Sequence, residues 1–185
     1  MARLEQIREQ LDVIRAQLGD DDAFMRLAER YHPRLLHYVR RLVRDRATAD
    51  DVMQETWVAA HRALRRLADL ERLRPWLYGI ARNQARNALR REERARLDYV
   101  EDEVLEAIPD DGGEAPELRA EQAAQVHRCL DQISPAHSEA LILCYMENLS
   151  YEEIADVIGC NIGTVRSRLH YAKLALREAM ESDER

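Results

Sequence analysis

LSYEEIADVIGCNIGTVRSRLH, residues 149–170, predicts two helices that are separated by a tight turn. Ser150 and Glu153 are spaced as in a capping box, in which each side chain bonds the backbone of the other residue, so a helix should begin there. Gly159 should end that helix, because glycine adopts the left-handed conformation without strain. Asn161 can then cap the second helix. This order of signals is typical of a helix-turn-helix, which places its second helix in the DNA major groove.

The second of these helices has an apolar side and a polar side. Val165, Leu169 and Ala172 recur at spacings of four and three residues and should face the core. The other side offers candidates for contacts with base edges and phosphates, namely Thr164, Arg166, Ser167, Arg168, His170 and Lys173. The alternative is an ordinary helical hairpin whose basic side is only solvated.

Charge is divided unevenly along the 185 residues, which carry a net charge of −7. Residues 24–96 contain 18 Arg and 9 acidic residues, whereas residues 97–118 contain 9 acidic residues and neither Lys nor Arg. A surface that binds phosphates depends on local rather than total charge. The pattern therefore predicts a basic module, an acidic connector and a second module.

The remaining periodic segments predict helices throughout. In the first half of the chain they are expected over 3–18, from Asp20 with an interruption or kink at Pro33, over 48–66 with Asp51 as a weak cap, and over 75–96 after a break at 68–74. Two more, over 118–133 and 135–146, should precede the helix-turn-helix.

The helix expected over 3–18 carries an apolar seam at heptad spacing, made of Leu4, Ile7, Leu11, Ile14 and Leu18. A lone helix of about 16 residues is marginal in water and should not leave such a seam exposed. We expect the seam to dock on the first module. Pairing with a regulator helix or with a second copy are the alternatives, and the mixed charges beside the seam favour neither.

Residues 98–117 are strongly acidic, contain Gly112 and Gly113 and lack apolar periodicity, as is typical of a flexible linker. The predicted fold class is all-α, with two small helical domains joined by this acidic flexible linker, the second being a helix-turn-helix domain. The expected bounds are 1–20 for an N-terminal helical extension, 21–96 for the first domain, 97–118 for the linker and 119–185 for the second domain.

A polar cluster near the start of the third helix has two interpretations. It consists of Asp50, Asp51, Gln54 and Glu55. Acidic side chains there can simply complement the helix dipole. They can also form a docking patch for a basic partner surface.

The fourth helix carries Arg82, Arg86 and Arg90 at four-residue spacing, with Asn83 and Asn87 between them. Arginines so spaced form a track of positive charge with about 6 Å per step, which suits a phosphate backbone. Asparagine offers both donors and acceptors, which base edges require. A solvated helix face is the alternative.

Four motifs occur together in this chain, and they are YHPRLL at 31–36, ADDVMQETW at 49–57, WLYGIARN at 76–83 and the helix-turn-helix at 149–168. In this order they resemble a bacterial extracytoplasmic-function (ECF) sigma factor of the sigma-70 family. The resemblance covers about residues 22–180. It implies two helical domains on a flexible linker and a subunit that directs RNA polymerase to promoters.

The resemblance also implies a role for each candidate surface. Asp50, Asp51, Gln54 and Glu55 would dock on the clamp helices of the polymerase's largest subunit, and the polymerase flap is a further expected contact. Segment 68–74 would capture a flipped base of the minus-ten element, which Asn83 and Asn87 would help to read beside Arg82, Arg86 and Arg90. The polar residues of 164–173 would meet the minus-thirty-five element. An anti-sigma factor is an expected partner.

Other function classes find little support in the sequence. It has no Gly-rich phosphate loop and no nucleophile motif, so we expect no enzyme, no catalytic residue, no metal site and no cofactor. Cys129, Cys144 and Cys160 lack C-x-x-C spacing and are expected to be buried free thiols. Without a signal peptide or an apolar stretch of membrane-spanning length, a cytoplasmic location is expected. A helix-turn-helix regulator that does not bind polymerase is the alternative function.

Overall fold

The computed structural model describes residues 2–43, 45–98, 125–126 and 128–183, so most of the predicted linker lies outside the described residues. The chain divides into two compact units between Leu105 and Glu106. Both units are helical, and their described parts contain no strand. This confirms the all-α fold class, while the predicted bounds of the domains stay predictions.

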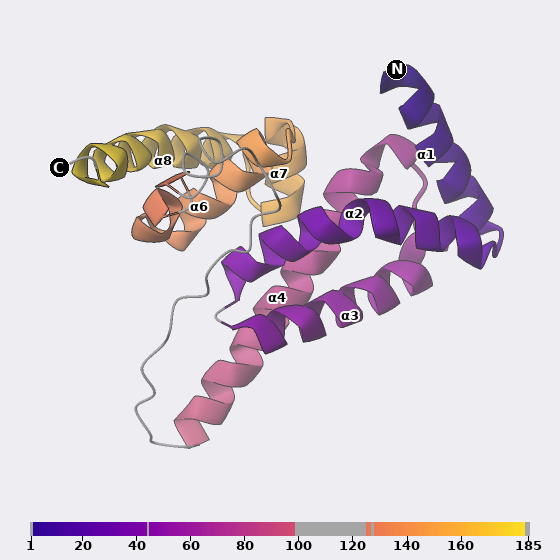
Figure 1. Ribbon diagram of the computed structural model, residues 1–185, viewed down its shortest axis with the longest axis horizontal. Helices are drawn as coiled ribbons and strands as arrows, with labels where there is room; N and C mark the ends of the chain where they lie inside the picture. The colour runs from indigo at the N-terminus through magenta and orange to yellow at the C-terminus, as the bar shows by residue number, and fades with distance from the viewer. Residues whose placement is uncertain (1, 44, 99–124, 127, 184–185) are drawn as a thin grey trace. The chain divides into compact units, whose positions relative to one another are not determined.

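The described part of the first unit consists of four α-helices and two short 3₁₀ turns (Figure 1). They are α1 (Ala2–Gln17), α2 (Asp21–Leu42), α3 (Arg46–Ala63), η1 (Leu64–Arg66), η2 (Leu70–Arg72) and α4 (Leu73–Asp98). Helices α2, α3 and α4 pack against one another, and α1 packs on α2 and the two turns.

Large side chains from α2, α3 and α4 form the core of this unit. The rings of Tyr38 and Tyr78 are fully buried, with centroids 5.1 Å apart in an edge-to-face arrangement that aromatic pairs favour. Leu35, Met53 and Leu77 complete the centre of this core. Because one side of α3 and of α4 is buried here, the opposite side of each helix is left exposed to solvent.

Of the two effects predicted for Pro33, an interruption or a kink of the second helix, the interruption is wrong, and the kink stays a prediction. Helix α2 runs through Pro33 as one element. Proline removes one backbone hydrogen bond from a helix interior. Tyr31 and Leu35, on either side of it, are both buried, and their burial offsets the lost bond.

The third helix begins earlier than predicted because a different residue caps it. The carboxylate of Asp45, not that of Asp51, accepts a hydrogen bond from the backbone N–H of Thr48 at 2.8 Å. Asp45 also accepts from the Thr48 hydroxyl at 2.6 Å. These hydrogen bonds, the hydroxyl one above all, hold the pKa of Asp45 below its usual value.

The predicted break at 68–74 is shorter than expected. It contains η2, and α4 already begins at Leu73 rather than at Pro75. Leu73 is buried in the core, and this anchor starts the helix two residues ahead of the proline. Trp76, one residue after that proline, is half-buried.

Helix α1 docks on the first unit as expected, but through the side opposite to the predicted one. Val13 is fully buried, and Gln17 Nε2 donates to the carbonyl oxygens of Leu64 and Leu67 at 3.0 and 2.7 Å. The five seam residues Leu4, Ile7, Leu11, Ile14 and Leu18 are instead 42% to 83% exposed. The prediction that the seam docks is therefore wrong, because polar pairs with α2 hold the other side of the helix inward.

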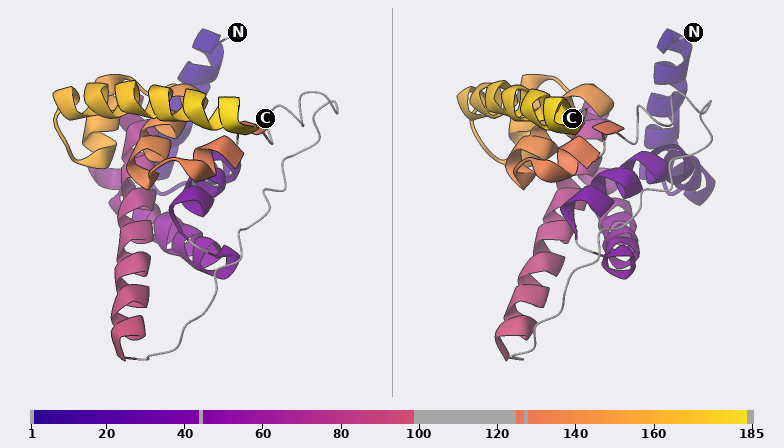
Figure 2. Two further views of the ribbon diagram at one scale, coloured as in Figure 1. Left: turned by 90° about the vertical axis from the view of Figure 1, so that its left-hand side faces the viewer. Right: turned by 60° about the vertical axis from the view of Figure 1, so that its left-hand side comes forward.

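The second unit contains α6 (Pro135–Leu141), the π-helical turn η3 (Ile142–Met146), α7 (Tyr151–Ile158) and α8 (Ile162–Asp183). The predicted helix over 135–146 thus changes from α to π geometry halfway. Helix α8 packs on both α6 and α7, and its yellow ribbon lies beside the orange elements in both views of Figure 2. Ile142, Leu143, Ile154 and Leu169 form the core.

The local signals of the helix-turn-helix are confirmed. Ser150 and Glu153 form the complete capping box, and Gly159 ends α7 at φ +72°. The Asn161 side chain accepts a hydrogen bond from the Thr164 N–H at 2.8 Å, which caps α8. Val165, Leu169 and Ala172 are buried as predicted.

Candidate functional site

Three members of the polar cluster on α3 line one cleft beside α4. Asp51 and Gln54, which are exposed, line it together with the half-buried Glu55, whereas Asp50 is exposed outside the cleft. Val58 lies one turn beyond Gln54 on the outer side and is 49% exposed. The outer face of α3 is therefore an acidic surface with an apolar end.

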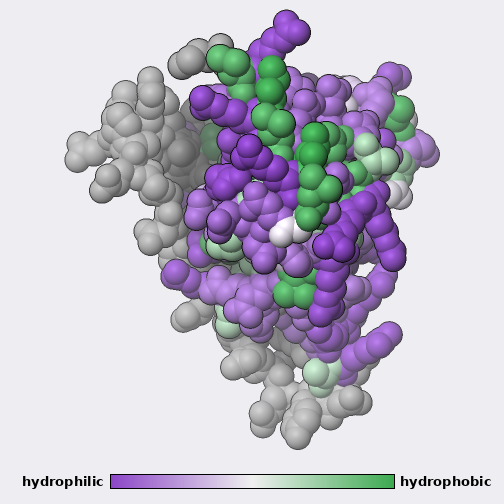
Figure 3. Space-filling view, turned by 90° about the vertical axis from the view of Figure 1, so that its right-hand side faces the viewer, coloured by the Kyte–Doolittle hydropathy of each residue, from purple (hydrophilic) through white to green (hydrophobic). Residues whose placement is uncertain are grey.

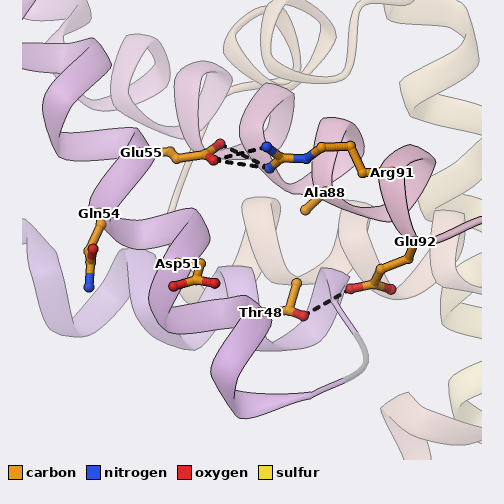
Figure 4. A pocket seen from close by; sticks show the side chains of 7 residues that line it. All are labelled: Thr48, Asp51, Gln54, Glu55, Ala88, Arg91 and Glu92. Carbon is orange, nitrogen blue, oxygen red and sulfur yellow. Dashed lines mark hydrogen bonds and ion pairs between the residues drawn. The ribbon is translucent and has the colours of Figure 1, made fainter. Parts of the chain in front are cut away.

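Glu55 is bound within the protein by an arginine of α4. Arg91 donates from Nη1 to Glu55 Oε1 at 3.1 Å and from Nη2 to Oε1 and Oε2 at 3.0 and 3.2 Å. Figure 4 shows the guanidinium and the carboxylate pointing directly at each other. The Arg91 and Glu55 side chains are 61% and 40% exposed, so this ion pair is a surface pair.

A cleft of about 330 Å³ lies between α3 and α4 at this pair (Figure 4). Its polar lining includes Thr48, whose Oγ1 lies 2.9 Å from Glu92 Oε1 and 2.6 Å from Asp45 Oδ2. A hydroxyl has one proton, so it donates to only one of these carboxylates at a time. The carboxylates make the cleft a site for cationic groups rather than for phosphate.

The outer face of α4 carries most of the predicted Arg and Asn residues. Asn83, Arg86, Asn87 and Arg90 are all exposed. At about 100° per residue they lie on one side of the helix, opposite the buried Ala81, Ala85 and Ala88. Arg82 is the exception, because it is half-buried and already interacts with a neighbouring group.

The candidate residues of α8 divide between the outer face and a flank. Arg166, Ser167 and His170 are exposed and point away from the core. Arg168 lies about 200° from Arg166 around the helix and is half-buried. Thr164 is also half-buried, and its hydroxyl lies 3.1 Å from the capping oxygen of Asn161. Arg166 therefore lies on the outer face of α8, and Arg168 does not.

Two further polar groups of α8 have partners inside the unit. The Ser167 hydroxyl donates to the Thr164 carbonyl oxygen at 3.0 Å, which leaves its oxygen as an acceptor. Lys173 Nζ lies 5.3 Å from the centre of the Tyr145 ring, which is a cation–π distance. Its hydrogen bond with Tyr145 raises the pKa of Lys173, so the ammonium stays charged.

Sequence reasoning missed two contributors to the α3 surface. Val58 could have been found from its position four residues after Gln54, which places it on the same side of the helix. Arg91 as the partner of Glu55 has no local signal, because the two residues are 36 positions apart.

The three cysteines do not form a site. Cys129 is buried, and Cys144 and Cys160 are half-buried, so only one matches the predicted full burial. Burial raises the pKa of both Cys129 and Cys144, which disfavours their reactive thiolates. Over the described ranges, no group of His, Cys, Asp and Glu could hold a metal ion.

No helix in the described part of the chain is long and apolar enough to span a membrane.

Two family models match the chain, one on each unit. Sigma-70 region 2 matches residues 27–95, and Sigma-70, region 4 matches residues 123–176. The RNA polymerase sigma-H factor of Pseudomonas aeruginosa is 38% identical over 96% of this chain and 96% of its own length. The ECF RNA polymerase sigma-E factor of Escherichia coli (strain K12) is 35% identical over 93% of this chain and 94% of its own length.

The fold is also similar to that of a solved protein. The sigma factor RpoE from Bartonella quintana, solved in complex with the anti-sigma factor NepR, matches with a TM-score of 0.70 and 26% identity over 86% of this chain and 98% of that chain. Relatives that align over nearly the whole chain and models that match both units agree with the resemblance carried by the four motifs. The chain therefore belongs to the extracytoplasmic-function class of sigma-70 RNA polymerase sigma factors.

Proposed function

We propose that this sigma factor acts through three exposed helix faces. The outer face of α3 docks on the clamp helices of the polymerase's largest subunit, that of α4 recognises the minus-ten element, and α8 enters the major groove at the minus-thirty-five element. The supporting observation is that each face lies opposite the buried side of its helix. The second unit would also contact the polymerase flap.

The docking face combines Asp50, Asp51 and Gln54 with the apolar end at Val58. Exposed carboxylates around an apolar contact suit a basic partner surface. Glu55 would join this contact only by leaving Arg91. A surface ion pair contributes about 0–1 kcal/mol, so a basic side chain of the polymerase can replace Arg91 at little cost.

On α4, the exposed Asn83 and Asn87 would read base edges, because an amide supplies both a donor and an acceptor. Arg86 and Arg90 stand on the same face and would follow the phosphate backbone. Arg82, which is half-buried, would support this surface from its edge. Segment 68–74, whose last two residues open this helix, would hold the flipped base, whose extrusion costs a few kcal/mol.

On α8, Arg166, Ser167 and His170 would face the base edges of the minus-thirty-five element. Arg168, Thr164 and Lys173 lie beside this face and would meet phosphates on the groove walls. Phosphate contacts position a helix, whereas base contacts carry the sequence preference.

The regulation and the class of activity follow from the same surfaces. An anti-sigma factor would cover them in the resting state, as the complex of the Bartonella relative suggests. We propose that the chain has no catalytic step of its own and acts in the cytoplasm, where polymerase and promoters are found.

The test is transcription from a promoter library by core polymerase with and without this protein. We expect initiation at a distinct subset of promoters only when the protein is present. Reversing Asp51 and Glu55 to Lys should weaken core binding roughly 100-fold or more, since juxtaposed like charges cost several kcal/mol.

Glu29→Lys is the matched control, because Glu29 is an exposed acidic residue on α2 outside the docking face. Helical content should be unchanged in both variants. If the double variant joins core polymerase with the affinity of the wild type, α3 is not the docking helix.

A further inference from the structure

The outward side of α1 is an apolar seam that no part of the described chain covers. Leu4, Ile7, Leu11, Ile14 and Leu18 are all at least 42% exposed. Figure 3 views the face of the molecule on which α1 lies and shows a band of hydrophobic side chains on it. The opposite side of the same helix is docked, so α1 cannot turn to bury the seam.

Two acidic side chains of α1 are occupied on the docked side. Asp12 Oδ1 accepts hydrogen bonds from Arg26 Nε and Nη2 at 3.0 and 2.7 Å. Glu9 Oε2 accepts from Arg30 Nη1 at 3.2 Å and from the Tyr31 hydroxyl at 2.8 Å. These contacts fix the rotation of α1 and neutralise the two carboxylates.

The charges that flank the seam are therefore of one sign. In a heptad frame with Leu4 at position a, the seam occupies a and d, and the adjacent e and g positions hold Arg3, Arg8, Gln10, Arg15 and Gln17. None of these five is acidic. With Glu9 and Asp12 paired to α2 and the exposed Glu5 at position b, the e and g positions form a frame around the apolar seam whose only charges are basic.

This arrangement selects one kind of occupant. A strict a/d seam is the narrow stripe on which a second helix packs, whereas a helix lying in a lipid surface has a broader apolar face. Residues at e and g determine the partner in such pairs. A second copy of α1 would place Arg against Arg, which is destabilising.

We propose that the seam of α1 is the docking site for an amphipathic helix of a partner protein that carries acidic residues beside its apolar stripe. The partner helix would pack its apolar residues against Leu4, Ile7, Leu11, Ile14 and Leu18. Its carboxylates would pair with Arg3, Arg8 and Arg15. This site is separate from the three faces proposed for polymerase and promoter. The proposal can therefore hold or fail independently of the proposed function.

The test measures binding of two synthetic peptides to the full-length protein by fluorescence anisotropy. Both peptides are about 20 residues long with Leu and Ile at a and d, and one has Glu at e and g while the other has Lys. We expect the Glu peptide to bind at least tenfold more tightly than the Lys peptide. The preference should weaken with salt.

Two protein variants examine the seam and its frame. Ile7→Gln with Leu11→Gln should weaken binding of the Glu peptide about tenfold or more, since each buried aliphatic side chain contributes about 1.5–3 kcal/mol. Arg8→Glu with Arg15→Glu should reverse the preference toward the Lys peptide. Leu174→Gln, which changes an exposed leucine of the second unit, should leave the affinity for the Glu peptide unchanged.

All four substituted seam and frame positions are exposed, and Gln and Glu favour helices, so the variants should keep their helical content. Equal binding of the two peptides, or binding of neither up to about 1 mM, would overturn the proposal. So would sedimentation of the wild type as a dimer that the seam variant abolishes, which would identify a second copy as the occupant. Seam-dependent binding to phosphatidylglycerol vesicles in place of the Glu peptide would identify a lipid surface instead.

Discussion

The helix-turn-helix of the second unit and the acidic face of the first unit are held in place in different ways. The helix-turn-helix is held by residues close in sequence, with Ser150 bonded to Glu153 and Asn161 to Thr164. The acidic face is joined to α4 by the Glu55–Arg91 pair, across 36 positions. The helix that we propose reads DNA is thus oriented by its own segment, whereas the proposed docking face has a weak internal pair that a partner could replace.

The largest expected effect tests the helix-turn-helix side of this comparison, through the two arginines of α8. Arg166→Ala should lose about 1–3 kcal/mol of discrimination between a minus-thirty-five site and scrambled DNA, because Arg166 is on the outer face. Arg168→Ala should weaken both DNAs alike and reduce the slope of affinity against salt, as loss of a phosphate contact does. Fluorescence anisotropy over a range of salt concentrations measures both quantities. Equal loss of discrimination in the two variants would contradict the division between face and flank.

The next effect concerns the turn that aims α8. Gly159→Ala should cost about 1–2 kcal/mol, since φ +72° is strained for any residue with a Cβ. A Cβ at this position would meet no heavy atom within 4 Å, so the cost comes from the backbone alone. Thermal unfolding and hydrogen exchange of residues 150–170 would show the loss. Faster exchange confined to the first unit would contradict a local origin.

A smaller effect concerns the Asp45 cap of α3 in the first unit, whose contribution to stability should depend on pH. Asp45→Ala should cost α3 about 1 kcal/mol near neutral pH, as loss of an N-cap does. The pKa of Asp45 is lowered by folding, so its contribution is present above the ordinary pKa of about 3.9 and is lost as the pH falls through the lower folded value. The difference from wild type should therefore shrink in acid. Hydrogen exchange of α3 at neutral and at acidic pH measures this difference in stability. Asp45→Asn, which keeps an uncharged cap, should retain most of the protection at both pH values.

The smallest expected effect concerns the Glu55–Arg91 pair, which joins the acidic face to α4. Arg91→Ala should change the free energy of unfolding by less than about 1 kcal/mol, because its pair with Glu55 is exposed. If Glu55 serves polymerase docking, releasing it should leave core affinity unchanged or raise it several-fold. Titration of labelled protein with core polymerase measures this. Core binding that falls as much in Arg91→Ala as in Glu55→Lys would show that the pair itself, rather than a free Glu55, is required.

Much of the helix-turn-helix was determined by the sequence alone. The capping box, the left-handed glycine and the Asn161 cap each depend on residues within a few positions of one another. Such signals are complete in a short segment and need no tertiary context. The exposed faces of α4 and α8 followed from helical periodicity for the same reason.

The tertiary structure decided what periodicity left open. From its sequence, α1 could dock through its apolar seam or through the opposite side. Arg26, Arg30 and Tyr31 on α2 selected the opposite side, because they bind Glu9 and Asp12 there. The same kind of long-range pairing joined Glu55 to Arg91 and carried α2 through Pro33. Local propensities set where helices form, but which face a helix buries depends on surfaces supplied by distant parts of the chain.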